Sequence, residues 1–232
     1  MKQTSKAATA GWRVIGRSLL FVLLVIGGGI IALWLKSAFA VAVIVLIGAW
    51  LLLSAFTLWF FRDPSACVPT APDAVVSPAH GLVDCVEEST ELGFVGGKCH
   101  RISIFLSVLD VHVQNSPVAG RITFLKHQSG RFLSALNTAS AECNENMLIG
   151  IESSERSGER IAVRQIAGVL ARRIVSWVNV GDHVARGQRL GLIQYGSRCD
   201  LYLPFSVKVA VRPGDRVVGG ETVVATRTPS LV

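Results

Sequence analysis

Residues 181–220 read GDHVARGQRLGLIQYGSRCDLYLPFSVKVAVRPGDRVVGG, and this stretch decides the fold. The pattern GDxVxxG opens it at Gly181 and returns 33 residues later at Gly214. Each Gly-Asp pair suits a tight turn with a positive φ, after which a short strand runs to a second turn at the next glycine. The repeated pattern therefore predicts two similar β-hairpin corners.

A second motif repeats upstream, where SPxxGxV at Ser77 returns 39 residues later as SPxxGxI at Ser116. From Val75 onward the chain consists of short β-branched runs interrupted by Gly, Pro and Asp, which are strand and turn signals, and only residues 134–143 resemble a short helix. We predict a mainly β fold: a barrel-sandwich-like antiparallel domain with repeated hairpins, similar to lipoyl and biotinyl carrier domains. Such carriers bear their cofactor on an exposed lysine at a hairpin tip, and neither Gly-Asp turn has one.

An apolar segment precedes this domain. The 43 residues from Leu19 to Phe61 contain a single charge, Lys36. At about 1.5 Å per residue a helix of this length would reach roughly 65 Å, twice the hydrocarbon core of a bilayer. The sequence therefore predicts an N-terminal transmembrane helical hairpin over residues 18–61 that turns near Lys36-Ser37. A re-entrant hairpin in one leaflet and a cleaved signal peptide are the alternatives.

The net charge of +7 belongs mainly to the apolar end of the chain. Residues 1–62 hold six bases and no acid, whereas residues 63–232 hold 17 bases against 16 acids, so a nucleic-acid partner is not indicated. Because basic flanks mark the cytoplasmic side, we expect the tail 1–17 and the domain 62–232 in the cytoplasm, with the hairpin in the inner cell membrane. The five cysteines are odd in number and form no C-x-x-C pair, which argues against a disulfide framework and against a metal site.

Five longer runs carry a resemblance: DVHVQNSPVAG from Asp110, then SGRFLSALNTASAECNEN, QIAGVLARRIVSWV, GDHVARGQRLGLIQYGSRCDLYLP and PGDRVVGGETVVA. In order and spacing they closely resemble the short, prokaryotic branch of the phosphatidylserine decarboxylases. The resemblance covers residues 61–225 and implies a proenzyme that cuts itself between Gly196 and Ser197. It further implies that Ser197 becomes a pyruvoyl group, which does the work of pyridoxal phosphate without a bound cofactor, and that no metal is needed. The implied substrate is phosphatidylserine in the membrane, and the products are phosphatidylethanolamine and carbon dioxide.

The same resemblance implies roles for individual residues. His112 in DVHV matches the family's histidine and is the expected acid that protonates the product; a structural histidine of the sheet is the alternative. Arg172, Arg173 and Arg198 lie in matched motifs, and arginine suits the phosphate and carboxylate of the headgroup. For Arg172 and Arg173 the alternative is an ordinary surface charge.

The chain departs from the family at one motif. Where the family has S-P-x-D-G, this chain has SPAHG, so that His80 replaces an aspartate. Three interpretations remain open: His80 is itself the base that activates Ser197, it slows maturation, or the chain is an unprocessed paralogue. Asn115 occupies the position of a second histidine that long members carry and short members generally lack.

Two competing functions also remain. One is a non-catalytic or unprocessed membrane-anchored adaptor with a barrel-sandwich domain, and the other is a processed enzyme that acts on a soluble amino acid. The sequence leaves the oligomeric state open, a homo-oligomer included.

Overall fold

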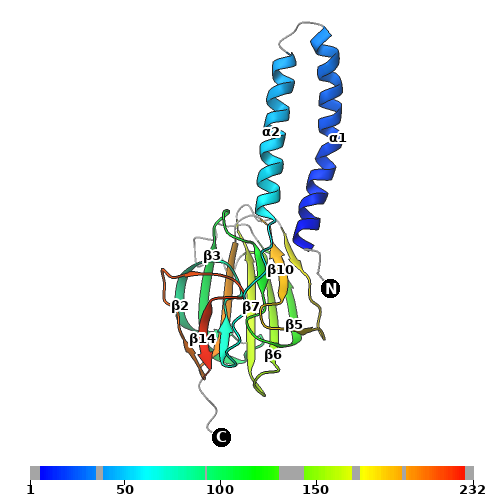
Figure 1. The fold of residues 1–232 in the computed structure, drawn as a ribbon. Coiled ribbons are helices and arrows are strands. Elements are labelled where there is room, and N and C mark those ends of the chain that lie inside the picture. The colour runs from blue at the N-terminus through cyan, green and yellow to red at the C-terminus, as the bar shows by residue number, and fades with distance from the viewer. Residues whose placement is uncertain are drawn as a thin grey trace. The chain divides into compact units, whose positions relative to one another are not determined.

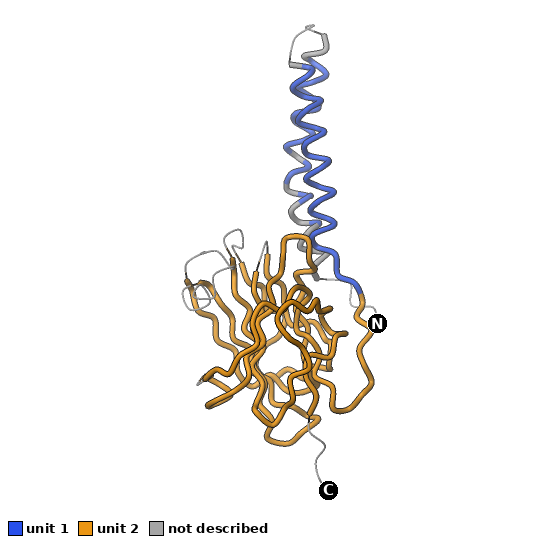
Figure 2. The backbone as a smooth tube through the Cα atoms, turned by 90° about the vertical axis from the view of Figure 1, so that its left-hand side faces the viewer, with its two compact units in different colours: residues 1–64 blue, residues 65–232 orange. Residues whose placement is uncertain are grey.

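The computed structural model describes residues 6–34, 39–91, 93–130, 144–168, 173–194 and 197–227. Contacts divide the chain into two compact units, residues 1–64 and residues 65–232 (Figure 2). The predicted turn at Lys36-Ser37 and the predicted short helix at 134–143 lie outside the described residues.

The first unit consists of two helices, α1 (Lys6–Trp34) and α2 (Phe39–Phe60), which lie side by side (Figure 1). Trp50 of α2 donates its indole N–H to the hydroxyl of Ser18 on α1 at 2.9 Å. Among the described residues, Ala40–Phe60 is the one helical stretch long and apolar enough to cross a membrane, with a mean hydropathy of 2.6. The prediction of a long apolar helix before the β domain is confirmed, whereas a bilayer pass in α1 stays a prediction.

The described part of the second unit consists of strands. Their bounds are β1 Ala74–Val76, β2 Gly81–Glu91, β3 Gly97–Leu106, β4 Val113–Asn115, β5 Gly120–Gln128, β6 Asn146–Ser153, β7 Arg160–Ala167, β8 Ile174–Ser176, β9 His183–Val184, β10 Arg189–Ile193, β11 Ser197–Pro204, β12 Val207–Val209, β13 Arg216–Val217 and β14 Val223–Arg227. They form one curled sheet in the order β13-β2-β3-β11-β7-β6-β5-β9 and two small sheets, β1-β14-β12 and β4-β10-β8. Neighbouring strands pair antiparallel throughout, so the prediction of a mainly β, antiparallel domain is confirmed.

The GDxVxxG repeats form two equivalent corners. Gly181 and Gly214 have φ values of 101° and 98°, and the closing glycines, Gly187 and Gly220, have 75° and 76°. An L-residue rarely adopts these angles, which explains why glycine stands at the same places in both copies. The predicted turns are therefore present with matching geometry.

Each corner pairs with the strand that follows one Ser-Pro motif. Val184 of β9 pairs with Gly120 at the start of β5, and Val217 of β13 pairs with Gly81 at the start of β2. One backbone hydrogen bond of 2.8 Å recurs in both copies, from Gly187 to Ser116 and from Gly220 to Ser77. The two sequence repeats thus interlock at both outer edges of the large sheet.

Strand β11 lies inside the large sheet, between β3 and β7. Cys199 and Leu201 belong to the hydrophobic core. Because side chains alternate along a strand, Ser197 points to this core face, and Arg198 and Asp200 point to the opposite face. The core is built mainly of Ile, Leu and Val side chains, which come from β11 and from the strands on either side of it in the sheet.

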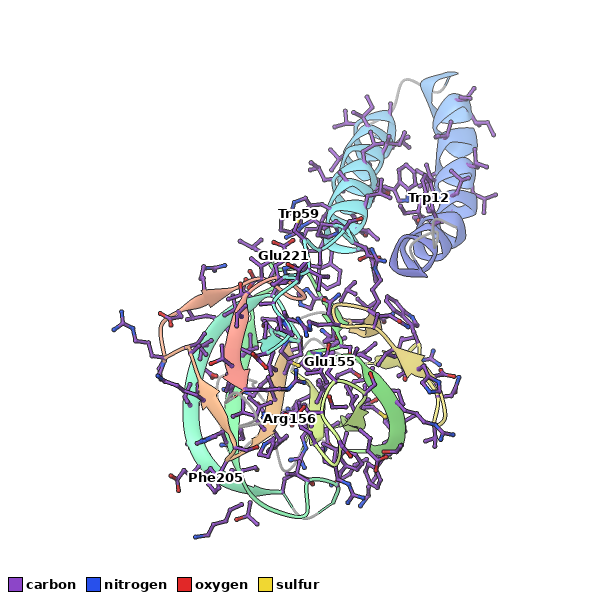
Figure 3. All side chains as sticks on the ribbon, turned by 60° about the horizontal axis from the view of Figure 1, so that its bottom comes forward. Trp12, Trp59, Glu155, Arg156, Phe205 and Glu221 are labelled. Atoms are coloured by element: carbon purple, nitrogen blue, oxygen red, sulfur yellow. The ribbon has the colours of Figure 1, made fainter. Side chains whose placement is uncertain are left out.

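A buried ion-pair network joins β14 to the connection between β6 and β7. The guanidinium of Arg227 contacts both carboxylate oxygens of Glu159, the shortest contact being 2.8 Å, and it pairs with Glu155 at 2.9 Å. Glu155, labelled in Figure 3, also pairs with Arg186 at 2.8 Å. Arg227 and Glu159 are almost fully buried, so each charge needs the other to offset the cost of its removal from water.

Replacing Arg227 with methionine is expected to lower the free energy of unfolding by about 3–5 kcal/mol, because Glu159 would remain buried without its counter-charge. Urea denaturation of the full chain in detergent measures this change. Arg212→Met is the matched control: its side chain is 88% exposed and pairs with Asp215 at 3.7 Å. We expect the control to change stability by less than about 1 kcal/mol, and an equal loss in both variants would contradict the prediction.

Candidate active site

Ser197 is the first residue of β11, and its side chain is completely buried. Its hydroxyl has no hydrogen-bond partner in the part of the chain that the structure describes. The backbone is held on both sides, because Ser197 pairs with Leu106 of β3 and with Ala167 of β7. A buried hydroxyl without a partner costs about 1–3 kcal/mol and calls for a functional explanation. Gly196, the residue before the predicted cut, lies outside the described residues.

His80 lies at the same end of the large sheet as Ser197. His80 directly precedes β2. The start of β2 lies next to the end of β3, and the end of β3 pairs with the start of β11. The register is fixed by the pairs Leu82–Phe105 and Leu106–Ser197. Because neighbouring strands are about 4.8 Å apart, the backbones at His80 and Ser197 are roughly 10 Å apart, with β3 between them.

The imidazole of His80 lies against Gly219 and near Asn115. An ideal Cβ at Gly219 would stand 3.1 Å from Nε2 of His80 and 2.9 Å from Oδ1 of Asn115. The amide of Asn115 donates to the carbonyl of Gly187 at 2.9 Å, so its orientation is fixed. The contacts described for His80 are thus with the loop after β13 and with β4. A role of His80 as the base for Ser197 stays a prediction.

His112 is completely buried and lies next to Ile193. Ile193 and Gln194 are the described residues just before the predicted cut and are called the cleavage segment below. Its Nδ1 is 2.9 Å from the carbonyl oxygen of Asp110. Because a carbonyl only accepts, Nδ1 carries the hydrogen. The carbonyl of His112 accepts the N–H of Ile193 at 3.2 Å, and Ile193 stands three residues before Gly196.

Asp110 fixes the loop that presents His112. Its Oδ2 accepts the backbone N–H and the hydroxyl of Ser107, at 2.8 and 2.7 Å. Burial opposes ionisation, but the hydrogen bonds from Ser107 and the charge of Arg216 outweigh it and lower the pKa of Asp110. The carboxylate is therefore ionised at neutral pH and holds the backbone of this loop.

Arg198 follows Ser197 but points to the opposite face of the sheet. Its guanidinium is almost fully buried and pairs with the carboxylate of Asp84. Asp84 sits in an irregularity of β2 between Val83 and Cys85. Burial raises the pKa of Asp84, and the charge of Arg198 partly offsets this effect. Headgroup binding by Arg198 stays a prediction, and sequence reasoning missed its partner Asp84.

Arg173 is exposed and lies beside the cleavage segment. Its carbonyl accepts the N–H of Gln194 at 3.2 Å, and the next residue, Ile174, pairs with Ile193. Arg172 lies outside the described residues. No group of three or more His, Cys, Asp or Glu in the described ranges is placed to hold a metal ion.

Comparison with known proteins identifies the family of the chain. Residues 53–225 match the family model described as phosphatidylserine decarboxylase. The chain is 48% identical over 191 residues to the phosphatidylserine decarboxylase proenzyme of Symbiobacterium thermophilum, which covers 80% of this chain and 88% of the relative. The proenzyme of Desulfotalea psychrophila is 45% identical over 173 residues, 75% of this chain and 80% of the relative. That of Nocardia farcinica is 48% identical over 170 residues, 72% of this chain and 71% of the relative.

These matches first define a class: the chain is a carboxy-lyase. More narrowly, it belongs to the phosphatidylserine decarboxylase family. The resemblance seen in the sequence is thereby confirmed over almost all of the β domain.

Proposed function

We propose that the protein is a membrane-anchored proenzyme that cuts its own chain between Gly196 and Ser197 and then decarboxylates phosphatidylserine to phosphatidylethanolamine. The observation that supports this most directly is the buried hydroxyl of Ser197, which has no partner among the described residues and stands at the start of an inner strand. The relatives are named phosphatidylserine decarboxylase proenzymes, which supports both the reaction and the precursor state. No observation favours the non-catalytic adaptor.

The cut needs only groups of this chain and water. Ser197 Oγ adds to the carbonyl carbon of Gly196, the peptide C–N bond breaks, and the nitrogen takes the proton of the hydroxyl, which leaves an ester. Loss of the Ser197 α-proton expels the Gly196 carboxylate, and the remaining enamine reacts with water and releases ammonia. A ketone then stands at the start of chain 197–232. Glycine before the nucleophile suits this chemistry because it has no Cβ to block the attack.

The space that holds Ser197 suits a pyruvoyl group, because this group keeps the same backbone position, has lost the hydroxyl, and carries a ketone oxygen where the amino nitrogen stood. When present, it supplies an electron-withdrawing carbonyl for the loss of carbon dioxide. His112 is the proposed acid, with Nε2 as the nitrogen that delivers the proton to the product carbon. His80, at the position of the family's aspartate, is kept as the candidate base for Ser197 because it lies at the same end of the sheet. The Ser197 hydroxyl has no partner among the described residues, so His80 would act through a water or after a movement of its side chain.

Arg173 is the favoured residue for the headgroup, because its side chain is exposed beside the cleavage segment. Arg172 and Arg198 are kept as further candidates. The apolar helix α2 supports membrane association, and the basic N-terminal tail supports an inner-membrane anchor with the catalytic domain in the cytoplasm. An anchor suits this substrate because its acyl chains stay in the bilayer, so the site must work at the headgroup plane.

The test is the mass of the purified protein together with its action on lipid. We expect two chains, 1–196 and 197–232, with the second lighter by one ammonia than a peptide that begins with serine, and blocked to Edman degradation. Vesicles that contain phosphatidylserine should gain phosphatidylethanolamine, and phenylhydrazine, which reacts with ketones, should stop this conversion. A single full-length species without lipid conversion would overturn the proposal.

A further inference from the structure

A pocket of about 350 Å³ lies on the face of the large sheet opposite to the Ser197 side chain. Side chains of β3, β5, β6, β7 and β11 form its floor, and the end of β2 with the following turn forms its rim. Tyr202 on the floor stands five residues after Ser197, about 17 Å along β11. At its other end Asn146 pairs with Ile166, the partner of Arg198, so this end of the pocket lies level with the start of β11. The pocket is separate from the Ser197 side chain because it opens on the other face of the sheet. Its polar floor consists of Arg101, Lys126, Gln128, Asn146, Arg164 and Tyr202.

Glu91 holds the rim in place. Its carboxylate accepts the backbone N–H groups of Gly93, Phe94 and Val95, at 2.7, 2.8 and 2.7 Å. Phe94 then packs on the sheet at Gly150, where an ideal Cβ would come within 2.6 Å of the ring. Because these bonds use both oxygens of Glu91, the carboxylate that lines the pocket serves the turn rather than the cations on the floor.

Three cations line the pocket. Arg101 pairs with Glu87 at 2.6 Å. Arg164 and Lys126 have no ion pair within the residues that the structure describes, and the buried Nε of Arg164 has no hydrogen-bond partner there. A buried N–H of a guanidinium without an acceptor costs free energy, and an anion bound to this N–H would recover it.

Asp200 lies beneath the pocket, but its carboxylate does not neutralise the cations of the pocket as a bound anion would. It is completely buried, and its nearest ion-pair contact is Arg101 at 3.9 Å. Burial raises the pKa of Asp200, while the charges of Arg101, Arg198 and Arg164 act in the opposite direction. Asp200 is thus influenced by the charges of three guanidinium groups, but its ion-pair contact is with Arg101.

We propose that this pocket binds a phosphate group, carried by free phosphate or by the headgroup of an anionic phospholipid. Arginine and lysine supply the charge and the directed N–H donors that phosphate oxygens prefer, and the amides of Gln128 and Asn146 add further donors. Tyr202 adds one more: burial raises the pKa of Tyr202 to about 12, so the phenol keeps its proton at neutral pH.

In the test, inorganic phosphate is titrated into the full chain in neutral detergent and chloride buffer, and calorimetry measures the heat of binding. We expect saturable binding that weakens about tenfold or more in Arg164→Gln, because a charge-assisted contact is lost. Lys126→Gln should also weaken binding. Because Lys126 is exposed, this substitution should leave the fold intact, so a weaker affinity would not be due to misfolding. Arg121→Gln, an exposed arginine on the same strand as Lys126 but outside the pocket, should bind like the unchanged protein.

A second titration distinguishes the two sources of phosphate. Glycerophosphoglycerol, an anionic lipid headgroup without acyl chains, should bind more tightly than inorganic phosphate if the pocket takes lipid, and less tightly if it takes free phosphate. Either order supports the proposal. Absence of heat with both probes, or equal affinity in the unchanged protein and both pocket variants, overturns it. Because the pocket is separate from Ser197, an uncut Ser197→Ala chain should bind phosphate normally, so this result does not depend on the proposed self-cleavage.

Discussion

Replacing Ser197 with alanine is expected to leave one uncut chain of 232 residues without decarboxylase activity. The hydroxyl is the proposed nucleophile of the cut and the precursor of the ketone, so its loss removes both steps at once. Denaturing gels and intact mass report the cut, and conversion of phosphatidylserine in vesicles reports the activity. The variant should stay folded, because alanine fills a buried site whose hydroxyl has no partner among the described residues.

Ser103→Ala is the matched control. Ser103 is also a completely buried serine of the large sheet, on the neighbouring strand β3, but its pairing partner is Asp200, on the face opposite to Ser197. The control should be cut and active. A Ser197→Ala chain that is still split at the same bond would contradict the proposed mechanism.

Replacing His112 with asparagine is expected to lower the rate of decarboxylation per cut chain by about 10²–10⁴-fold, the usual contribution of a general acid. An asparagine amide can still donate to the carbonyl of Asp110, as Nδ1 does now, but it cannot deliver the proton that Nε2 is proposed to supply. The rate has to be divided by the fraction of cut chain measured by mass, so that an effect on maturation is kept apart.

His183→Asn serves as the control for this change, because His183 is exposed on β9 at a sheet edge. It should leave the rate per cut chain unchanged. If the His112 variant also keeps its full rate per cut chain, then His112 is a structural residue of the sheet and another group protonates the product.

Much of the fold was predictable because its signals are local. A Gly-Asp pair followed by a glycine at fixed spacing demands positive φ at two places, and the structure has them at Gly181, Gly187, Gly214 and Gly220. A long apolar run predicts a helix in the same local way, as α2 confirms. Because the two copies of each motif are equivalent, the same pairing recurs at both edges of the sheet, β9 with β5 and β13 with β2.

The charged side of the large sheet was not predictable from the sequence. Alternation along β11 would normally place Arg198 and Asp200 in water, whereas both are buried. Asp84 meets Arg198 because the register of β2 shifts beside it, and a local pattern carries no information about such a shift between distant strands. Ser197 and His112 were singled out through the family resemblance, and the strand register then brings their segments to one end of the sheet.

The place of β11 has a consequence for the life of the molecule. If the bond before Ser197 is cut as proposed, the 36-residue fragment begins with the inner strand β11, which remains paired between β3 and β7 of the other fragment. The precursor assembles as one molecule at any dilution, but an unfolded mature enzyme could reassemble only if two separate fragments met. The proposed cut would therefore make unfolding of the mature protein effectively irreversible, so that its lifetime would depend on the rate of unfolding rather than on an equilibrium.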